Sequence, residues 1–435
     1  MSGALSERGD RHDGSAADLA DVRMIDQATR DATEGVARRS YGKLVAYLSV
    51  RTRDVAAAED ALADAFAAAL ADWPASGIPH SPEAWLLSVA RRKSIDAARR
   101  RRTVLEGEDQ VRLTAQELED AAMNANDIPD QRLALMFACA HPAIDQGVRA
   151  PLILQTVLGF DAAAIASAFL VAPATMGQRL SRAKAKIRQA GVPFRVPERA
   201  DLAERLDAVL AAIYAAFAEG WSDPAGTQTR RRNLSEEGIW LGRLVASLLP
   251  DEAEALGLLA LMLHADARRA ARRLDGEYVP LAEQDPAAWD AALIEEAEAL
   301  LRRASALGVI GRYQLEAAVQ SVHAARRFTG RTDWAALEKL YDALLALTGS
   351  PVVAINRAVA LAETQGAGAG LAALDALSDD ARLAEYQPYW AARAGLLARM
   401  EQTQDAGRAY ERAIGLESDP AVRRFLQGKR DALSA

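Results

Sequence analysis

The sequence predicts an all-α fold made of two small helical domains, the second a helix-turn-helix, and a C-terminal domain of helical repeats. Three observations lead to this expectation. Alanine and arginine dominate the chain, and both favour helices. Aromatic residues make up only 6% of it, and no segment shows strand-like alternation. With 435 residues, 50% of them apolar, the chain is long enough for about two to four domains with buried cores.

The composition also excludes several classes of function. The lone Cys139 excludes a disulfide framework and a multi-cysteine metal site. The five histidines are scattered without an i,i+4 pair, and no nucleophile, base and orienting acid converge in the sequence. We therefore expect no metal, no cofactor and no enzymatic activity. Because no apolar run approaches the roughly 18–20 residues of a membrane span and the N-terminus lacks a signal peptide's apolar core, we expect a cytoplasmic protein.

The charges are distributed unevenly along the chain. Acidic and basic residues balance over residues 1–200, so the whole net charge of −8 lies in residues 201–435. Within the first half, the basic residues gather in two segments, 91–102 and 174–190. Two basic helices on a neutral half predict a module that binds a polyanion, joined to a domain of a different kind.

The first domain reads as three helices after a polar tail, residues 1–28. Apolar residues at helical spacing predict helices over 29–50, 56–73 and 83–102. Prolines and a glycine between the last two predict a loop over 74–82. Ser81 is placed to cap the third helix, with Pro82 at its first position.

A second helical domain follows an acidic, weakly periodic linker at residues 104–127. Its expected core consists of Leu133, Leu135, Met136, Phe137, Leu152, Leu154 and Val157, with Cys139 among them. Residues 161–169 predict a short helix, 170–173 a turn, and the following residues a second helix that ends at Gly191.

The second helix of this pair has two distinct faces. One face carries the apolar Met176, Leu180, Ala183 and Ile187, and the opposite one carries Thr175, Gln178, Arg179, Arg182 and Lys186. A helix-turn-helix needs this pattern, because one stripe holds the helix on its domain while the other offers polar groups to a major groove. An ordinary basic pair of surface helices is the alternative reading.

Beyond Pro197 the sequence predicts stacked helices. Six residues fit the small and large positions of a tetratricopeptide-like helix pair: Trp390, Ala394, Leu397, Ala406, Tyr410 and Ala413. Asn356, Ala360, Ala372 and Ala376 lie 34 residues before four of them. Residues 366–370 (GAGAG) follow no strand and lack a Lys-Ser/Thr, so we interpret them as a loop between helices and not as a phosphate-binding loop.

These stretches together resemble bacterial extracytoplasmic-function sigma factors. The resemblance rests on AEDALADAF (58–66), PEAWLLSVARRKSIDAARRRR (82–102) and the helix-turn-helix at 161–191. IPDQRLALMFACAHPAI (128–144), LMLHADARRAAR (261–272) and GEYVPLAEQDPAAWD (276–290) fit the subgroup with a C-terminal tetratricopeptide-like domain. The resemblance implies sigma region 2 at 29–103, region 4 at 128–196 and the C-terminal domain at 197–435.

The resemblance also implies roles for particular residues. Polymerase docking falls on Glu59, Asp60, Asp64 and Phe66. Recognition and melting of the −10 element fall on the 74–82 loop and the following helix, through His80, Ser81, Trp85, Arg91, Arg92, Lys93 and Arg99. Reading of the −35 element falls on Thr175, Gln178, Arg179, Arg182 and Lys186, with Ser181 and Arg188 placed to reach phosphates.

The implied function is that of a sigma factor that directs core RNA polymerase to promoters, with the nucleoid as its place of action. Its partners would be the polymerase, promoter DNA and a regulatory protein on the C-terminal domain. The alternative is a helix-turn-helix regulator with a helical-repeat sensor domain. Residues 55–102 discriminate between the two, because a simple regulator has no need of a docking helix followed by a melting helix. For the C-terminal domain, a regulatory clamp, a docking surface and a stabilising extension stay open.

Overall fold

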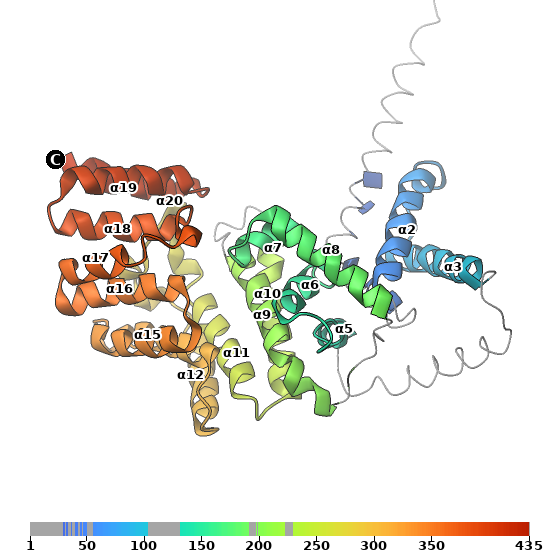
Figure 1. Ribbon diagram of the computed structural model, residues 1–435, viewed down its shortest axis with the longest axis horizontal. Coiled ribbons are helices and arrows are strands. Elements are labelled where there is room, and N and C mark those ends of the chain that lie inside the picture. Colours follow the sequence, from blue (N-terminus) through green and yellow to red (C-terminus); the bar gives the residue numbers. More distant parts are fainter. Residues whose placement is uncertain are drawn as a thin grey trace, which may run out of the picture. The chain divides into compact units, whose positions relative to one another are not determined.

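The computed structural model describes residues 55–102, 131–190, 197, 199–221 and 229–434, with scattered helical positions between 29 and 49. The chain divides into two compact units: the first holds residues up to Ala212 except Ala168–Val171, and the second holds Ala168–Val171 and the residues from Ile213 on. Both units are built from helices (Figure 1). The predicted all-α fold is therefore confirmed.

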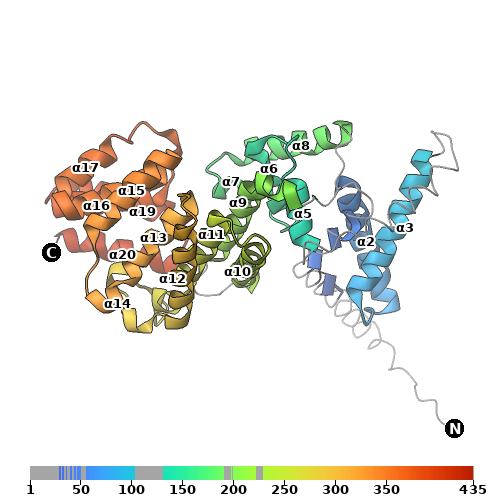
Figure 2. The same ribbon diagram turned by 90° about the horizontal axis from the view of Figure 1, so that it is seen from below.

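The first unit begins with two helices that pack against each other, α2 (Val55–Ser76) and α3 (Pro82–Arg102) (Figure 2). Ala and Leu residues of α2 supply the buried face, with Leu62 fully buried. Trp73 of α2 meets Trp85 of α3 edge to face, with ring centroids 5.4 Å apart. The aromatic pair therefore fixes the two helices to each other near their connection.

The connection between α2 and α3 is shorter than the sequence predicts. We expected a loop from residue 74, but α2 continues through Pro74 to Ser76. Gly77 ends the helix with a φ of 82°, and its N–H donates to the Trp73 carbonyl over 2.9 Å. A proline is tolerated this close to the helix end because buried Trp73 holds the last turn by tertiary packing. Helix α3 starts at Pro82, as expected, and the Ser81 carbonyl accepts from the Trp85 N–H.

The first unit continues with further helices of different lengths. They are α5 (Gln131–Cys139), α6 (Gln146–Thr156), α7 (Ala162–Ala168) and α8 (Pro173–Ala190), followed by the turn η2 (Arg199–Asp201) and helix α9 (Leu202–Trp221). The predicted core of this segment is confirmed, because all seven of its apolar residues are buried. Cys139 is buried too, and its Sγ lies 3.5 Å from Thr156 Oγ1. Burial raises the pKa of this thiol to about 12.

Helices α7 and α8 form the predicted helix-turn-helix. Asp161 precedes α7 and caps it, because its Oδ1 accepts from the Ala164 N–H over 2.8 Å. Leu170 in the turn has a φ of 51°, so the chain reverses there in the left-handed region. Ile165 of α7 and Met176 and Leu180 of α8 are buried, which anchors both helices on the unit.

The second unit starts in α9 and continues through α10 (Thr229–Leu248) and α11 (Ala253–Asp266). After η3 (Ala270–Arg272), η4 (Leu281–Glu283) and η5 (Pro286–Ala288), it continues as α12 (Ala291–Ala306), α13 (Arg312–Ala324), α14 (Arg326–Thr329) and α15 (Trp334–Thr348). Helix α11 packs against α10, α12 and α13 and is buried over almost its whole length. Apolar residues around the full circumference of α11 account for this central position.

A short β-hairpin between η3 and η4 contradicts the expectation that no strand occurs. Strands β1 (Arg273–Leu274) and β2 (Glu277–Tyr278) pair antiparallel. Asp275 and Gly276 between them have φ values of 51° and 84°, the left-handed pair that a two-residue turn requires. Strands of two residues show no alternation, so the Asp-Gly dipeptide was the only local signal for this hairpin.

The chain ends in antiparallel helix pairs that lie side by side (Figure 1). They consist of α16 (Pro351–Gln365) with α17 (Ala367–Asp375), and of α18 (Gln387–Arg399) with α19 (Thr403–Leu416), joined by η6 (Ala381–Leu383). Helix α20 (Pro420–Asp431) and η7 (Ala432–Ser434) follow. The expected loop at 366–370 is wrong, because Gly366 alone leaves the helix and α17 starts at Ala367. Gly370 lies inside α17, where α16 packs so close, through Ala358 and Ala362, that no Cβ would fit.

Candidate nucleic-acid interface

Helix α8 presents a polar stripe to the surface. Its predicted −35 residues Thr175, Gln178, Arg179, Ser181, Arg182 and Lys186 are exposed. Met176 and Leu180 on the opposite side are buried, with 1% and 2% of their surface exposed. Because these two anchors turn one face of α8 inward, the hydroxyl, amide and guanidinium groups of the other face are available to a ligand. The side chain of the remaining predicted residue, Arg188, lies outside the described residues.

A cavity of about 420 Å³ lies beside this stripe. Arg179, Arg182 and Lys186 of α8 line one side, and Ile144 and Val148, before and in α6, line another. The Asp145 carboxylate in the same wall accepts from the Gly147 N–H over 3.0 Å and caps α6. The cavity therefore combines an apolar floor with three cationic side chains, a suitable surface for a phosphate group.

Gly177 lies inside α8 between the polar and apolar faces. No atom lies within 4 Å of the position that a Cβ would take there. Packing therefore does not require a glycine at this position. The glycine lowers the stability of the helix by about 1 kcal/mol relative to alanine, because its backbone loses more conformational freedom.

Helix α3 carries the second basic face. Arg91, Arg92 and Lys93 are all exposed, while Leu86 and Ala90 are fully buried. Arg92 Nη2 donates to Ser88 Oγ over 3.2 Å, which leaves the guanidinium on the surface. The structure thus separates the apolar and basic faces of this helix in its described turns. The side chain of Arg99 is outside the part of the chain that the structure describes.

The predicted −10 residues before and at the start of α3 lie close together in the chain. His80 and Ser81 are exposed, and Trp85 is half-buried against Trp73. Trp85 is therefore packed against the domain yet partly accessible to solvent.

The predicted docking residues on α2 are in two different environments. Asp60 and Asp64 are exposed and four residues apart, so they lie on one face of the helix. Phe66 is half-buried and stacks on Tyr41 with ring centroids 6.4 Å apart. Burial, followed by the charge of Glu59, raises the pKa of Tyr41 to about 12. Phe66 therefore contributes to the packing of the unit as well as to the predicted surface.

Glu59 makes a contact that the sequence did not indicate. Its carboxylate accepts from Lys184 Nζ of α8 over 2.7 Å, and 16% of the Glu59 side chain and 23% of the Lys184 side chain are exposed. This ion pair joins the predicted docking helix to the predicted recognition helix. The two residues are 125 positions apart, and no local pattern in a single sequence connects them.

The described part of the chain contains no group of three or more His, Cys, Asp or Glu side chains that could hold a metal ion. None of its helices is long and apolar enough to cross a membrane.

Two family models match the chain. The model of sigma-70 region 2 matches residues 36–104, which include α2 and α3. A family of unknown function, DUF6596, matches residues 205–305, from α9 to α12. An uncharacterized protein of Rhizobium meliloti (strain 1021) is 38% identical over 402 residues, which cover 91% of this chain and 94% of the relative. No solved structure matches the chain.

The match to region 2 decides between the two functions that the sequence left open. Region 2 of the sigma-70 family serves promoter recognition and implies core RNA polymerase and promoter DNA as partners. Proteins of this family are transcription initiation factors, not enzymes. The described helices α2 and α3 make up most of the matched segment, and their exposed acidic and basic faces agree with this role. The chain therefore belongs with the sigma-70 factors: its region 2 is followed by a DUF6596 segment, an arrangement that fits a sigma factor similar to those of the extracytoplasmic-function type.

Proposed function

We propose that the chain reads both promoter elements, −35 with α8 and −10 with α3 and the residues before it, and helps to open the duplex. The exposed stripe of α8, with its apolar side buried, is the observation that supports this proposal most. It has the residue types that read base edges in a major groove: Gln178 for adenine and Arg179 for guanine. Arg182 and Lys186 are exposed on the same helix and would read the element with them, and exposed Ser181 would reach a phosphate.

The role of α3 in strand opening follows from the chemistry of a displaced strand. Bases that leave the duplex need an aromatic or cationic surface in place of their stacking partners. Half-buried Trp85 and exposed Arg91, Arg92 and Lys93 offer both on one helix. His80 and Ser81 precede the helix and are exposed, so they are placed for contacts to an extruded base.

Polymerase docking through α2 would use the exposed Asp60 and Asp64 first. Glu59 can contribute only when its ion pair with Lys184 opens. Docking through Glu59 would then compete with the contact between α2 and α8. The cost of opening is modest, because partly exposed pairs of this kind contribute about 0.5–1 kcal/mol.

The C-terminal helical domain would supply regulation, with a further protein docking on it as part of this proposal. Its excess of negative charge is the feature that supports a regulatory role, because an acidic domain can compete with DNA for basic helices. Such competition weakens as salt is added. The tetratricopeptide-like character of α16–α19 belongs to the same proposal, as does action on the nucleoid in the cytoplasm.

Substitution at Arg179 tests the reading of the −35 element. Arg179→Ala should lower transcription from promoters with an intact −35 element by about tenfold or more, because a bidentate guanine contact discriminates by about 1–3 kcal/mol. Discrimination against promoters with a mutated −35 element should disappear in the same variant. The matched control is Arg303→Ala, since Arg303 is an exposed arginine of α12. If Arg179→Ala retains full discrimination at the −35 element, α8 does not read it.

A further inference from the structure

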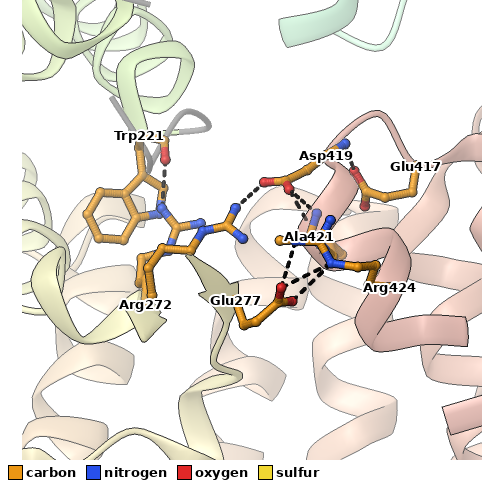
Figure 3. Close-up of polar contacts among 9 residues, drawn as sticks. Trp221, Arg272, Glu277, Glu417, Asp419, Ala421 and Arg424 are labelled. Atoms are coloured by element: carbon orange, nitrogen blue, oxygen red, sulfur yellow. Dashed lines mark hydrogen bonds and ion pairs between the residues drawn. The ribbon is translucent and has the colours of Figure 1, made fainter. Parts of the chain in front are cut away.

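The second unit contains a cluster of arginines that promoter recognition does not use. We call Arg268, Arg272, Arg273 and Arg326 the arginine cluster. The first three follow the end of α11, at the start of the β-hairpin, and Arg326 begins α14. All four residues are half-buried, so their guanidinium groups are partly withdrawn from bulk water. Figure 3 shows Arg272 at Trp221 and the hairpin residue Glu277 directed toward α20.

Three of these four guanidinium groups have no carboxylate partner among the described residues. Arg272 Nη1 donates to the Trp221 carbonyl over 2.6 Å, and its Cζ lies 4.2 Å from the Trp221 ring centroid. Arg326 donates to the carbonyls of Leu281 and Gln284, over 2.9 and 2.6 Å. Arg268 donates to the amide oxygen of Gln320. Neutral acceptors thus hold these three groups without neutralising their charge.

Arg273 is paired on one side only. Its Nη2 donates to Asp419, the residue before α20, but its Nε and Nη1 are buried and have no hydrogen-bond partner. Only 11% of the Arg273 side chain is exposed, so water does not satisfy these two donors freely. Unsatisfied buried donors of a guanidinium are costly, so Arg273 can gain stability by donating to a further acceptor.

Two acidic residues of the second unit pair with arginines outside the arginine cluster. Glu277 of β2 pairs with Arg424 of α20 over 2.8 Å, as Figure 3 shows. Glu316 pairs with Arg312 over 2.7 Å. Burial, followed by the charges of neighbouring arginines, lowers the pKa of Arg268 to about 10. The same two causes, with the charges of Arg268 and Arg326, lower the pKa of His323 to about 4, so this imidazole is neutral at pH 7.

We propose that the arginine cluster is a binding site for a small phosphate-bearing molecule. A phosphate monoester carries about −1.5 to −2 charges at pH 7 and three strong acceptor oxygens. It can therefore accept from several guanidinium forks at once and offset most of the uncompensated positive charge. A single carboxylate, with one charge and two oxygens, would leave most of these donors unsatisfied. The site lies within the DUF6596 segment and α14, so it gives the C-terminal unit a ligand of its own.

Hydrogen exchange of the full-length chain with inorganic phosphate as the probe tests this proposal. Measurements in phosphate and in chloride, at equal ionic strength and pH, should show slower amide exchange at residues 268–278 and 320–326. Phosphate that protects only α8, or no segment of the second unit, would overturn the proposal. Protection of 268–278 by a single-stranded oligonucleotide but not by phosphate would also overturn it, since the site would then bind nucleic acid. Citrate that protects these residues as strongly as phosphate would contradict the choice of phosphate.

Calorimetric titration with phosphate gives the matching comparison between variants. Arg268→Gln combined with Arg272→Gln should weaken phosphate binding by at least about tenfold, because two forks are lost. Arg302→Gln combined with Arg303→Gln removes the same charge from the exposed side of α12 and should change the affinity by less than about twofold. Equal losses in both double variants would mean that general charge, not the arginine cluster, attracts the phosphate. The exchange measurement on the unmodified chain decides the question even if the first variant does not fold.

Discussion

At the scale of single residues, the structure shows where local sequence patterns are informative and where they are not. Met176 and Leu180 are buried and Gln178 and Arg179 exposed, as the helical spacing predicted, because a period of 3.6 residues assigns each position to a face. The ion pair of Glu59 with Lys184 could not be predicted, because a contact across 125 positions depends on tertiary packing. The carbonyl and amide oxygens that accept from the arginine cluster could not be predicted either, because these contacts also depend on tertiary packing.

Loss of the ion pair should strengthen polymerase binding if Glu59 takes part in docking. Lys184→Met removes the cation and frees the Glu59 carboxylate. We expect the affinity for core polymerase, measured without DNA, to rise about two- to fivefold, in line with the 0.5–1 kcal/mol of a partly exposed pair. Lys186→Met is the matched control, because Lys186 is an exposed lysine of the same helix. A control that tightens binding equally would show that Glu59 is not the group released.

The buried histidines should make the second unit sensitive to acid. Burial is the main cause that lowers the pKa of both His264 and His323 to about 4. The unfolded chain, with a histidine pKa near 6.5, then binds more protons than the folded one between pH 6.5 and 4, so stability falls as the pH falls through this window. At pH 5 we expect each histidine to cost about 1–2 kcal/mol.

Denaturant unfolding at pH 7 and pH 5 measures this effect. His323→Gln removes one titrating group, so the difference in the free energy of unfolding between pH 7 and pH 5 should shrink by about 1–2 kcal/mol. This difference does not depend on how much stability the substitution itself removes at pH 7. Parallel profiles for the variant and the unmodified chain would show that His323 is not buried as a neutral imidazole.

At the scale of elements, the helices were predictable and several of their boundaries were not. Apolar periodicity predicted α2, α3, α7 and α8, because each of these helices buries one face. Pro74 was read as a helix breaker, but the packing of Trp73 keeps it in the last turn of α2. Strands β1 and β2 are too short for alternation to appear. Packing against α20 supports them, since Tyr278 meets Phe425 edge to face with ring centroids 5.4 Å apart.

The junction of the hairpin with α20 should be a stability determinant of the second unit. Asp419 caps α20, accepting from the Ala421 N–H over 2.8 Å, and also pairs with Arg273. Asp419→Ala removes the cap, worth about 1 kcal/mol, and leaves a largely buried guanidinium without its carboxylate. We expect a loss of about 2–3 kcal/mol in the free energy of unfolding, measured by urea denaturation.

Asp405→Ala is the control for this prediction. Asp405 also lies at the start of a helix and pairs with an arginine, Arg408, but both side chains are more than half exposed. Its loss should cost less than about 0.5 kcal/mol, because exposed pairs contribute little. Equal effects of the two substitutions would show that burial of Arg273 does not add to the contribution of Asp419.

At the scale of the whole molecule, the chain combines a promoter-recognition unit with a helical unit that carries most of the net negative charge. The sequence predicted this combination because basic and acidic residues segregate along the chain. The expected start of the C-terminal domain at residue 197 stays a prediction, and the division between the two compact units falls inside α9, after Ala212. A continuous helix has no compositional break at such a point, so its division between two cores becomes visible only in the structure.

Reconstituted transcription tests the central claim most directly. The full-length chain would be combined with sigma-free core polymerase and a pooled library of genomic promoter fragments, and transcript starts would be mapped. A sigma factor that reads two elements predicts defined starts that share two spaced upstream sequences, and no such starts from core polymerase alone. Binding of the chain to duplex DNA without core polymerase, together with no initiation in its presence, would contradict this account.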